Sequence, residues 1–386
     1  MRHFDFLSPE TRGRLFFREP REFGSDDSRD LLAAALGATL YSPATRPTLA
    51  VDIAKNFAHG VVGAVVCLED AVADDDLPAA ELNVVDQLTE LARGGSARPL
   101  LFVRVRAARQ IPMLVDRLGE HAGVLTGFVL PKFTATSGAQ FLDAMVAAES
   151  ASGHRLLAMP VLETPDVIYA EQRIDALLSV RALLDRHRDR ILAVRIGATD
   201  LSSAFGLRRP RDLTVYDVRM VADAIGDIVN ILGRPGPTGY PVTGPVWEYF
   251  TGTERLFKPQ LRQSPFTEHA ANALRDELIT RDLDGLIREV HLDRANGLTG
   301  KTVIHPMHVA TVHALSVVTH EEFADATDVL GTGGSGGAHA SSYRNKMNES
   351  KPHTAWARRT MVRAHVFGVA HADVSFVDLL GAGLHR

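Results

Sequence analysis

The sequence predicts an α/β protein organised as a (β/α)8 TIM barrel, and three observations support this prediction. Short runs rich in β-branched residues alternate with helical stretches, as expected for βα units around a parallel sheet. Eight such runs occur, which favours a closed barrel over an open doubly wound sheet. No Gly-x-Gly-x-x-Gly opens a helix after the first run, so a dinucleotide-binding sheet has no support. An open α/β sheet remains the alternative.

The predicted strands are separated by gaps that leave room for helices. The clearest helical patterns cover residues 166–186 and 217–232. The seventh strand is the weakest candidate because it lies inside a stretch rich in Gly and Pro. In order, the eight predicted strands are 38–42, 63–68, 100–106, 127–131, 156–162, 192–196, 240–245 and 302–305.

Two segments fall outside the predicted barrel domain, which covers residues 37–310. Residues 1–36 form an N-terminal extension, and residues 311–386 form a helical C-terminal tail. The tail contains a Gly-rich run at 331–337, which we expect to be a flexible hinge or an active-site loop. Apolar residues between Trp356 and Phe367 predict a final amphipathic helix that needs a surface to cover. We therefore predict a homo-oligomer with the tail near a subunit boundary; the alternative is that the tail covers its own barrel.

The composition excludes several classes of protein. With 42 Lys and Arg against 47 Asp and Glu among 386 residues, the net charge of −5 leaves no basic field for nucleic acid. The single cysteine, Cys67, excludes an internal disulfide framework and a zinc site built from cysteines. No apolar run approaches the ~20 residues that span a bilayer, and the N-terminal sequence lacks the apolar core of a signal peptide. We expect a cytoplasmic protein that binds neither nucleic acid nor a membrane.

Two carboxylates are predicted to meet at one end of the barrel. In this fold the functional groups lie where strands run into the loops that follow them. Glu163 and Asp200 come at the ends of the fifth and sixth predicted strands. Because neighbouring strands lie about 4.8 Å apart, the two side chains can share one Mg²⁺, which is usually bound by one or two carboxylates plus water and substrate oxygens. For each residue, the alternative is that the carboxylate caps the helix that follows.

Basic side chains are predicted at the same end of the barrel. Alternation along the third strand puts Arg104 and Arg106 on one face, and a guanidinium there can hold a carboxylate through two hydrogen bonds. For Arg104, a structural salt bridge to Glu69 or Asp70 is the alternative. Lys132 follows the fourth strand and could be a Schiff-base lysine or an electrostatic contributor.

Two further residues follow the outermost strands of the predicted order. Arg46 comes after the first strand, and His305 ends the eighth. We expect both to contribute to the pocket wall and to bind substrate. Lys301 enters the eighth strand from its far end, so we expect a structural or partner contact there.

The motifs at the strand ends occur in a fixed order along residues 38–310. They are Pro43 with Arg46 and Lys55, Leu68-Glu69-Asp70-Ala71-Val72, Val103-Arg104-Val105, Pro131-Lys132, Leu162-Glu163-Thr164, Gly197-Ala198-Thr199-Asp200-Leu201, and Gly300-Lys301 through Ile304-His305-Pro306. This series resembles the citrate lyase beta-chain family of the HpcH/HpaI aldolase superfamily. The pattern also resembles a longer-chain branch of carbon–carbon bond lyases, which would account for the extensions and for the polar segment 343–349.

The resemblance implies a Mg²⁺-dependent barrel enzyme that cleaves or forms a carbon–carbon bond next to a 2-oxo or 3-hydroxy acid. It assigns the metal to Glu163 and Asp200 and the substrate carboxylate to Arg104. It also implies that Glu69 and Asp70 order metal-bound water or assist proton transfer. Elementary chemistry agrees, because breaking such a bond leaves an enolate whose charge a divalent ion and a guanidinium can stabilise.

The sequence also departs from the family pattern. Pro43-Ala44 stands where Pro-Gly is expected, the basic residues usual after the acidic motif are missing from 74–81, and an insertion surrounds 251–280. These departures affect the acyl-CoA part of the family substrate more than the metal chemistry, so a small carboxylate or a conjugate of it is the expected ligand. Two other functions remain open: a malate synthase-like condensing or thioester-hydrolysing enzyme that uses the same site, and a binding subunit without turnover. Retained charged residues at the strand ends favour an enzyme.

Overall fold

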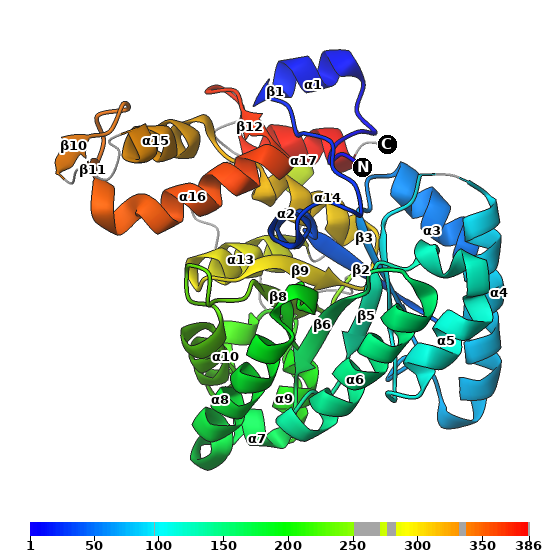
Figure 1. Cartoon of the computed structure of the whole chain (residues 1–386). Helices are drawn as coiled ribbons and strands as arrows, with labels where there is room; N and C mark the ends of the chain where they lie inside the picture. Colours follow the sequence, from blue (N-terminus) through cyan, green and yellow to red (C-terminus); the bar gives the residue numbers. More distant parts are fainter. Residues whose placement is uncertain (96, 251–270, 276–282, 332–336, 385–386) are drawn as a thin grey trace.

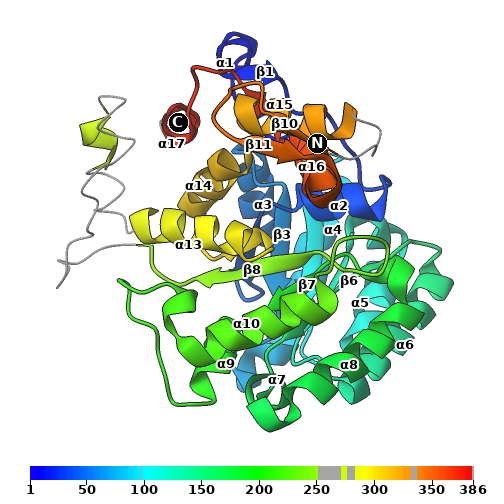
Figure 2. The same cartoon turned by 90° about the vertical axis from the view of Figure 1, so that its left-hand side faces the viewer.

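A closed barrel of eight parallel strands forms the centre of the molecule, as the sequence predicts (Figures 1 and 2). The computed structural model describes residues 1–95, 97–250, 271–275, 283–331 and 337–384. Each strand pairs with the next in the chain, and the last pairs with the first, Thr39 lying opposite Thr302. The strands are β2 (Ala38–Pro43), β3 (Gly63–Cys67), β4 (Leu100–Arg104), β5 (Gly127–Leu130), β6 (Leu157–Leu162), β7 (Val194–Ile196), β8 (Val242–Trp247) and β9 (Thr299–Val303).

The last strand begins before its predicted position. The prediction started it at residue 302, whereas β9 begins at Thr299 and includes Lys301. Lys301 looks too polar for a strand interior, but its fully buried ammonium contacts Glu289 at 2.8 Å and Asp293 at 2.7 Å. Two carboxylates from the preceding helix thus offset the cost of burying this charge. A structural role for Lys301 agrees with the expectation.

Helices surround the barrel, and short 3-10 turns join some of them. Helix α6 starts with a capping box in which Thr134 and Ser137 each accept a hydrogen bond from the other's backbone N–H. The helices that follow the strands are α3 (Leu49–Ala58), α4 (Leu77–Arg93), α5 (Gln110–Leu118), α6 (Ala135–Ser152), α7 (Pro165–Ile168), α8 (Ala170–Arg186), α9 (Ala198–Ser203), α10 (Arg219–Leu232), α13 (Leu283–Ala295) and α14 (Met307–Ser316). The 3-10 turns are η1 (Asp74–Asp76), η2 (Gly119–Val124), η3 (Arg188–Arg190) and η4 (Val215–Asp217).

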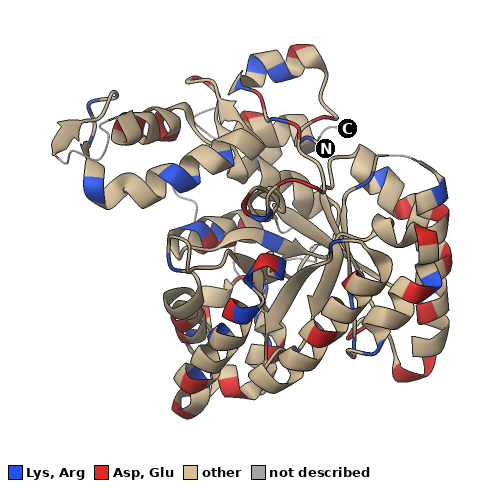
Figure 3. Ribbon diagram, in the orientation of Figure 1, with Lys and Arg blue, Asp and Glu red and all other residues tan. Residues whose placement is uncertain are grey.

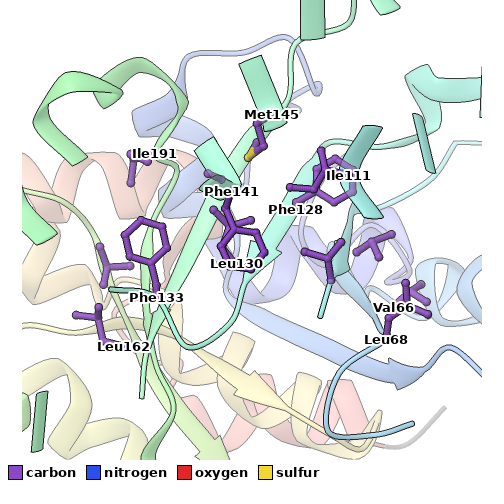
Figure 4. Packing of buried hydrophobic residues seen from close by; sticks show 14 of the residues in the cluster. Val66, Leu68, Ile111, Phe128, Leu130, Phe133, Phe141, Met145, Leu162 and Ile191 are labelled. Atoms are coloured by element: carbon purple, nitrogen blue, oxygen red, sulfur yellow. The ribbon is translucent and has the colours of Figure 1, made fainter. Parts of the chain in front are cut away.

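Apolar side chains fill both faces of the strands. Figure 4 shows the layer between the strands and the outer helices, where Phe128 and Leu130 of β5 meet Phe141 and Met145 of α6. The inside of the barrel holds a second cluster, which includes Phe102, Val129 and Met159. Burial on both faces explains why the strands are near-continuous aliphatic runs in the sequence. The strands are therefore rigid supports for the polar groups at their ends.

The two ends of the chain meet on one side of the barrel, above it in Figures 1 and 2. Strand β1 pairs antiparallel with β12, and Phe367 at the end of α16 joins the cluster inside the barrel together with Leu32 of α2. The N-terminal elements are α1 (Pro9–Leu15), β1 (Phe16–Arg18) and α2 (Arg29–Ala35). The tail contains α15 (His320–Gly331), β10 (Ala338–Ala340), β11 (Met347–Glu349), α16 (Ser350–Phe367), β12 (Val369–Ala370) and α17 (Phe376–Leu384).

Three expectations about the organisation of the chain can be compared with the structure. The predicted amphipathic helix after Trp356 is part of α16, which packs on α2 in the N-terminal extension of its own chain; the homo-oligomer stays a prediction. The expected domain boundary at residue 310 falls inside α14. Most of the Gly-rich run 331–337 and most of the insertion around 251–280 lie outside the described residues.

Charged side chains are mixed over the surface. In the view of Figure 3, blue Lys and Arg and red Asp and Glu both occur on the outer helices, with red more frequent around α4. This distribution agrees with the small negative net charge. Among the described residues, no helix has both the length and the apolarity needed to cross a bilayer.

Candidate active site

The carboxyl ends of five consecutive strands bring six charged side chains together. Glu69 and Asp70 follow β3, Arg104 ends β4, and Lys132 comes two residues after β5. Glu163 follows β6, and Asp200 lies in the first turn of α9 after β7. We call these six residues the charged cluster. All of the residues predicted to be catalytic or metal-binding belong to it.

Arg104 lies among the carboxylates of the charged cluster. Its Nη2 is 2.7 Å from Glu69 Oε2, 3.0 Å from Glu163 Oε1 and 3.3 Å from Asp70 Oδ2. The Arg104 side chain is 13% exposed, and its buried Nε has no hydrogen-bond partner among the described residues. Burial alone would lower the pKa of Arg104, but Glu163 and its other neighbours raise it above its ordinary value. The structural salt bridge considered as an alternative therefore exists, and three acids contact one nitrogen of this guanidinium.

Lys132 also contacts carboxylates of the charged cluster. Its Nζ is 2.5 Å from Glu69 Oε1, 3.2 Å from Asp70 Oδ1 and 4.0 Å from Asp200 Oδ1. Its backbone N–H donates a hydrogen bond to Glu163 Oε1 at 2.8 Å, in a left-handed conformation with φ of 45°. Burial alone would lower the pKa of Lys132, but the hydrogen bond to Glu69 and the nearby charges raise it. A Schiff-base lysine needs the opposite shift, so the geometry favours the electrostatic alternative.

The charged cluster contains more negative than positive charge. Four carboxylates face one guanidinium and one ammonium. Burial, together with the charges of Asp200 and Glu69, raises the pKa of Glu163 to about 7. Burial and the charge of Asp70 also raise the pKa of Asp200 above its ordinary value. Neighbouring carboxylates disfavour each other's ionisation, and a divalent cation would remove that penalty.

The residues present fit a hard divalent cation. Glu163 and Asp200 offer carboxylate oxygens from adjacent βα loops, and neither caps a helix: no side chain caps α7 or α9. The absence of a side chain at Gly197 makes room for Glu163, because a Cβ added to Gly197 would lie 2.1 Å from Glu163 Oε2. Within the described residues, no group of three or more His, Cys, Asp or Glu side chains forms a ready-made metal cage. Two carboxylates with water and substrate oxygens are the usual set for Mg²⁺.

A cavity of about 340 Å³ opens beside the charged cluster. Its lining includes Asp70, Arg104, Glu163 and Asp200 of the charged cluster, and it also includes Arg195 and several apolar side chains. The sequence reasoning missed Arg195, although a basic residue inside the aliphatic run 192–196 was a visible signal. The other lining residues are Tyr41, Val161, Ile196, Gly197, Thr199, Ser203, Val246, Thr302 and Ile304.

Three predicted substrate-binding residues lie outside the charged cluster. Arg46 is paired with Asp52 at 2.8 Å and is mainly exposed. Arg106 contacts Asp74 at 2.5 Å and donates to the carbonyls of Glu69 and Val72, so it holds the loop after β3.

His305 also follows a strand without lining the cavity. Its ring stacks on Phe250 with 5.1 Å between centroids, and burial lowers its pKa. For Arg46, Arg106 and His305, a contact with substrate stays a prediction.

Comparisons with known proteins agree with this arrangement. The model of the family described as the carbon–carbon bond lyase of the TIM-barrel fold matches residues 30–369, and the chain belongs to this family. None of the curated proteins gives a significant match.

Solved structures of low sequence identity share the fold. A citrate lyase from Burkholderia xenovorans LB400 has a TM-score of 0.60 and 16% identity, over 91% of this chain and 96% of that one. The CitE protein of Mycobacterium tuberculosis, in complex with magnesium, acetoacetate and coenzyme A, has a TM-score of 0.53 and 22% identity, over 86% and 99%. Haloferax volcanii malate synthase, in a magnesium/glyoxylate complex, has a TM-score of 0.50 and 12% identity, over 71% and 73%.

Proposed function

We propose that this member of the carbon–carbon bond lyase family uses Mg²⁺ to cleave a small 2-oxo or 3-hydroxy carboxylic acid through an enolate. The observation that supports the proposal most directly is the excess of carboxylates in the charged cluster. Glu163 and Asp200 would hold the metal, since they lie on adjacent loops and both have raised pKa values. When bound, Mg²⁺ supplies positive charge that stabilises the enolate oxygen formed as the bond breaks.

Arg104 and Lys132 have a positioning role in this proposal. Arg104 keeps Glu69 and Glu163 in place through contacts of 2.7 and 3.0 Å. The Lys132 backbone N–H donates to the same Glu163 Oε1 that Arg104 contacts, and the Lys132 ammonium contacts both acids after β3. Groups held in place before the substrate arrives need no rearrangement during the reaction. Both cations also add positive charge beside the developing enolate.

Asp70 is the best candidate for proton transfer. Its side chain is 54% exposed and lines the cavity, whereas Glu69 is almost fully buried. Burial alone would raise the pKa of Asp70, but its hydrogen bond with Glu69 and the charges of Arg104 and Lys132 lower it. Asp70 is therefore ionised at neutral pH and can accept a proton from a substrate hydroxyl group. Glu69 would help to hold this loop residue in place, since its carboxylate accepts a hydrogen bond from the backbone N–H of Asp70 at 2.9 Å.

The ligand class follows from the size of the cavity. A space of about 340 Å³ accommodates a small organic acid, and its open side lets a conjugate such as a thioester extend outward. The CitE structure that contains acetoacetate and coenzyme A supports this possibility by likeness of fold alone. A cytoplasmic location and a homo-oligomeric state stay predictions.

Calorimetric titration with pyruvate and oxaloacetate, with and without Mg²⁺, tests the proposed function. We expect binding that needs the metal in the parent and disappears in Glu163→Gln. The exposed Glu120→Gln is the matched control, since it removes the same charge from the outer surface. Incubation with 2-oxo or 3-hydroxy acids, and with acyl-CoA plus 2-oxo acids, then separates cleavage from condensation. Metal-dependent binding without turnover would support a binding subunit, and binding independent of both metal and Glu163 would refute the proposal.

A further inference from the structure

Arg195 differs from the other deeply buried arginines in the described part of the chain. Four arginines there are more than nine-tenths buried: Arg12, Arg173, Arg195 and Arg209. Arg12 contacts Glu19 at 3.0 Å, Arg173 contacts Asp227 at 2.9 Å, and Arg209 contacts Glu289. Arg195 is 1% exposed, and within the described residues no carboxylate lies within 4.0 Å of it. Burying a guanidinium without an anion costs free energy. An anionic ligand would lower this cost for Arg195, since the described residues supply no carboxylate next to it.

The groups in direct contact with Arg195 are neutral, and the charged side chain that acts on it from further away, Arg104, is another cation. Its Nη2 donates to Thr302 Oγ1 at 2.6 Å, and its Nη1 lies 3.4 Å from Thr39 Oγ1. The guanidinium carbon is 5.4 Å from the centroid of the Tyr41 ring. Burial lowers the pKa of Arg195, but an arginine keeps its proton at neutral pH. Hydroxyl groups and a ring face orient this cation without neutralising it.

Arg195 lines the same cavity as the metal carboxylates but at a deeper level. It lies opposite Val161 in the β6–β7 register, and Glu163 is two residues after Val161, just past the end of β6. Two residues of a strand span roughly 6.6 Å, so one layer separates Arg195 from the level of Glu163. The cavity therefore has excess negative charge at its mouth and a lone positive charge at its floor. An anionic ligand group at the level of Arg195 meets a positive charge and lies one layer away from the four carboxylates of the charged cluster.

We infer that Arg195 is a specificity-determining residue that binds a second carboxylate of the substrate at the floor of the cavity. The substrate is then a short dicarboxylic acid, with one end at the metal carboxylates and the other at Arg195. This inference deepens the proposed function and rests on it for the orientation of the ligand. It also explains how the enzyme binds a carboxylate although Arg104 is already held by three acids of its own chain.

The test compares a monocarboxylate with a dicarboxylate of the same class. Dissociation constants of pyruvate and oxaloacetate are measured by calorimetry with Mg²⁺ for the parent and for Arg195→Met and Arg195→Lys. The parent should prefer oxaloacetate at least tenfold, since the second carboxylate gains a charge-assisted hydrogen bond. Arg195→Met should lose that preference and keep its affinity for pyruvate, and Arg195→Lys should retain part of it. The exposed Arg117→Met is the control for the loss of one charge.

Two outcomes would overturn the inference. An equal affinity of the parent for the two acids would do so without any variant, which covers the case that Arg195→Met fails to fold. An unchanged oxaloacetate preference in a folded Arg195→Met would show that Arg195 is only a structural support.

A failure of the proposed function can be distinguished from a failure of the inference about Arg195. If neither acid binds, melting curves with malonate in the absence of metal test Arg195 alone. Malonate should then protect the parent and Arg117→Met but not Arg195→Met, and equal protection of all three would reject the floor site.

Discussion

Replacing Glu163 with Gln should stabilise the metal-free protein at alkaline pH and abolish its stabilisation by Mg²⁺. The folded chain raises the pKa of this carboxyl group from an ordinary 4.5 to about 7. One unit of pKa corresponds to about 1.4 kcal/mol, so ionising Glu163 in the folded protein costs about 3 kcal/mol above pH 7. Gln keeps the shape and never ionises. Arg104 retains Glu69 and Asp70 as partners in the variant.

The sign of the pH dependence follows from the direction of this shift. Because the folded form binds the Glu163 proton more tightly than the unfolded form, this group's stabilising contribution is fully present below about pH 4.5. It is lost as the pH rises to about 7 and stays lost above that value. The parent and Glu163→Gln should therefore have similar stability at pH 4 and diverge by about 3 kcal/mol at pH 8. Glu120→Gln should show no such divergence, since its side chain is 89% exposed.

Magnesium should reverse the order of stability. A ligand that binds only the folded form at a hundredfold excess over its Kd stabilises it by about 2.7 kcal/mol. The parent should gain this amount at pH 8, and Glu163→Gln should gain almost none. Denaturation curves with EDTA and with Mg²⁺ at pH 4 and pH 8 measure both effects. A variant that is no more stable than the parent at pH 8 in EDTA, or that gains as much from Mg²⁺, would refute the electrostatic reasoning.

Three further changes test individual contacts. Gly197→Ala should abolish Mg²⁺-dependent stabilisation, because the added Cβ would lie 2.1 Å from Glu163 Oε2; an unchanged Mg²⁺ response in melting curves would contradict this. Arg104→Lys should lose most of kcat/KM, since a compact ammonium on a flexible stem does not reproduce the fixed geometry of the guanidinium that contacts three acids, and parental kinetics would show that this geometry is unimportant. Deleting residues 338–386 should uncover the apolar cluster that contains Phe367 and make the chain aggregate, as light scattering can show, whereas a soluble and active product would count against this packing.

The barrel was predictable from the sequence because its strands are buried on both faces. Such strands are short aliphatic runs, and eight of them in alternation with helices leave few other architectures. The pairing of Glu163 with Asp200 was predictable for a related reason, since consecutive strands of a barrel end side by side. The start of β9 was not predictable, because the charge of Lys301 is compensated by acids on a helix that the strand pattern does not reveal.

The surface on which the tail packs also could not be predicted from the sequence. The apolar face of α16 indicates that the helix covers something, but the pattern is the same for a surface on the same chain and for a surface on another. In the structure, Val366 and Phe367 join Leu32 and Phe102 at the barrel interior. The pairing of β1 with β12 then ties both ends of the chain to this side. Contacts between segments more than 300 residues apart leave no local signal in either segment.

The roles of the two central arginines show most clearly what a sequence leaves open. Arg104 and Arg195 each lie in a strand and point into the barrel, so residue type and periodicity give them the same prospects of binding a carboxylate. Their partners distinguish them: Arg104 contacts three acids of the chain, and Arg195 contacts hydroxyl groups. A guanidinium that is already neutralised has little charge left for a ligand, and one that is buried without an anion gains most from binding one. We therefore expect the second substrate carboxylate at Arg195, with Arg104 keeping the carboxylates of Glu69, Asp70 and Glu163 in position.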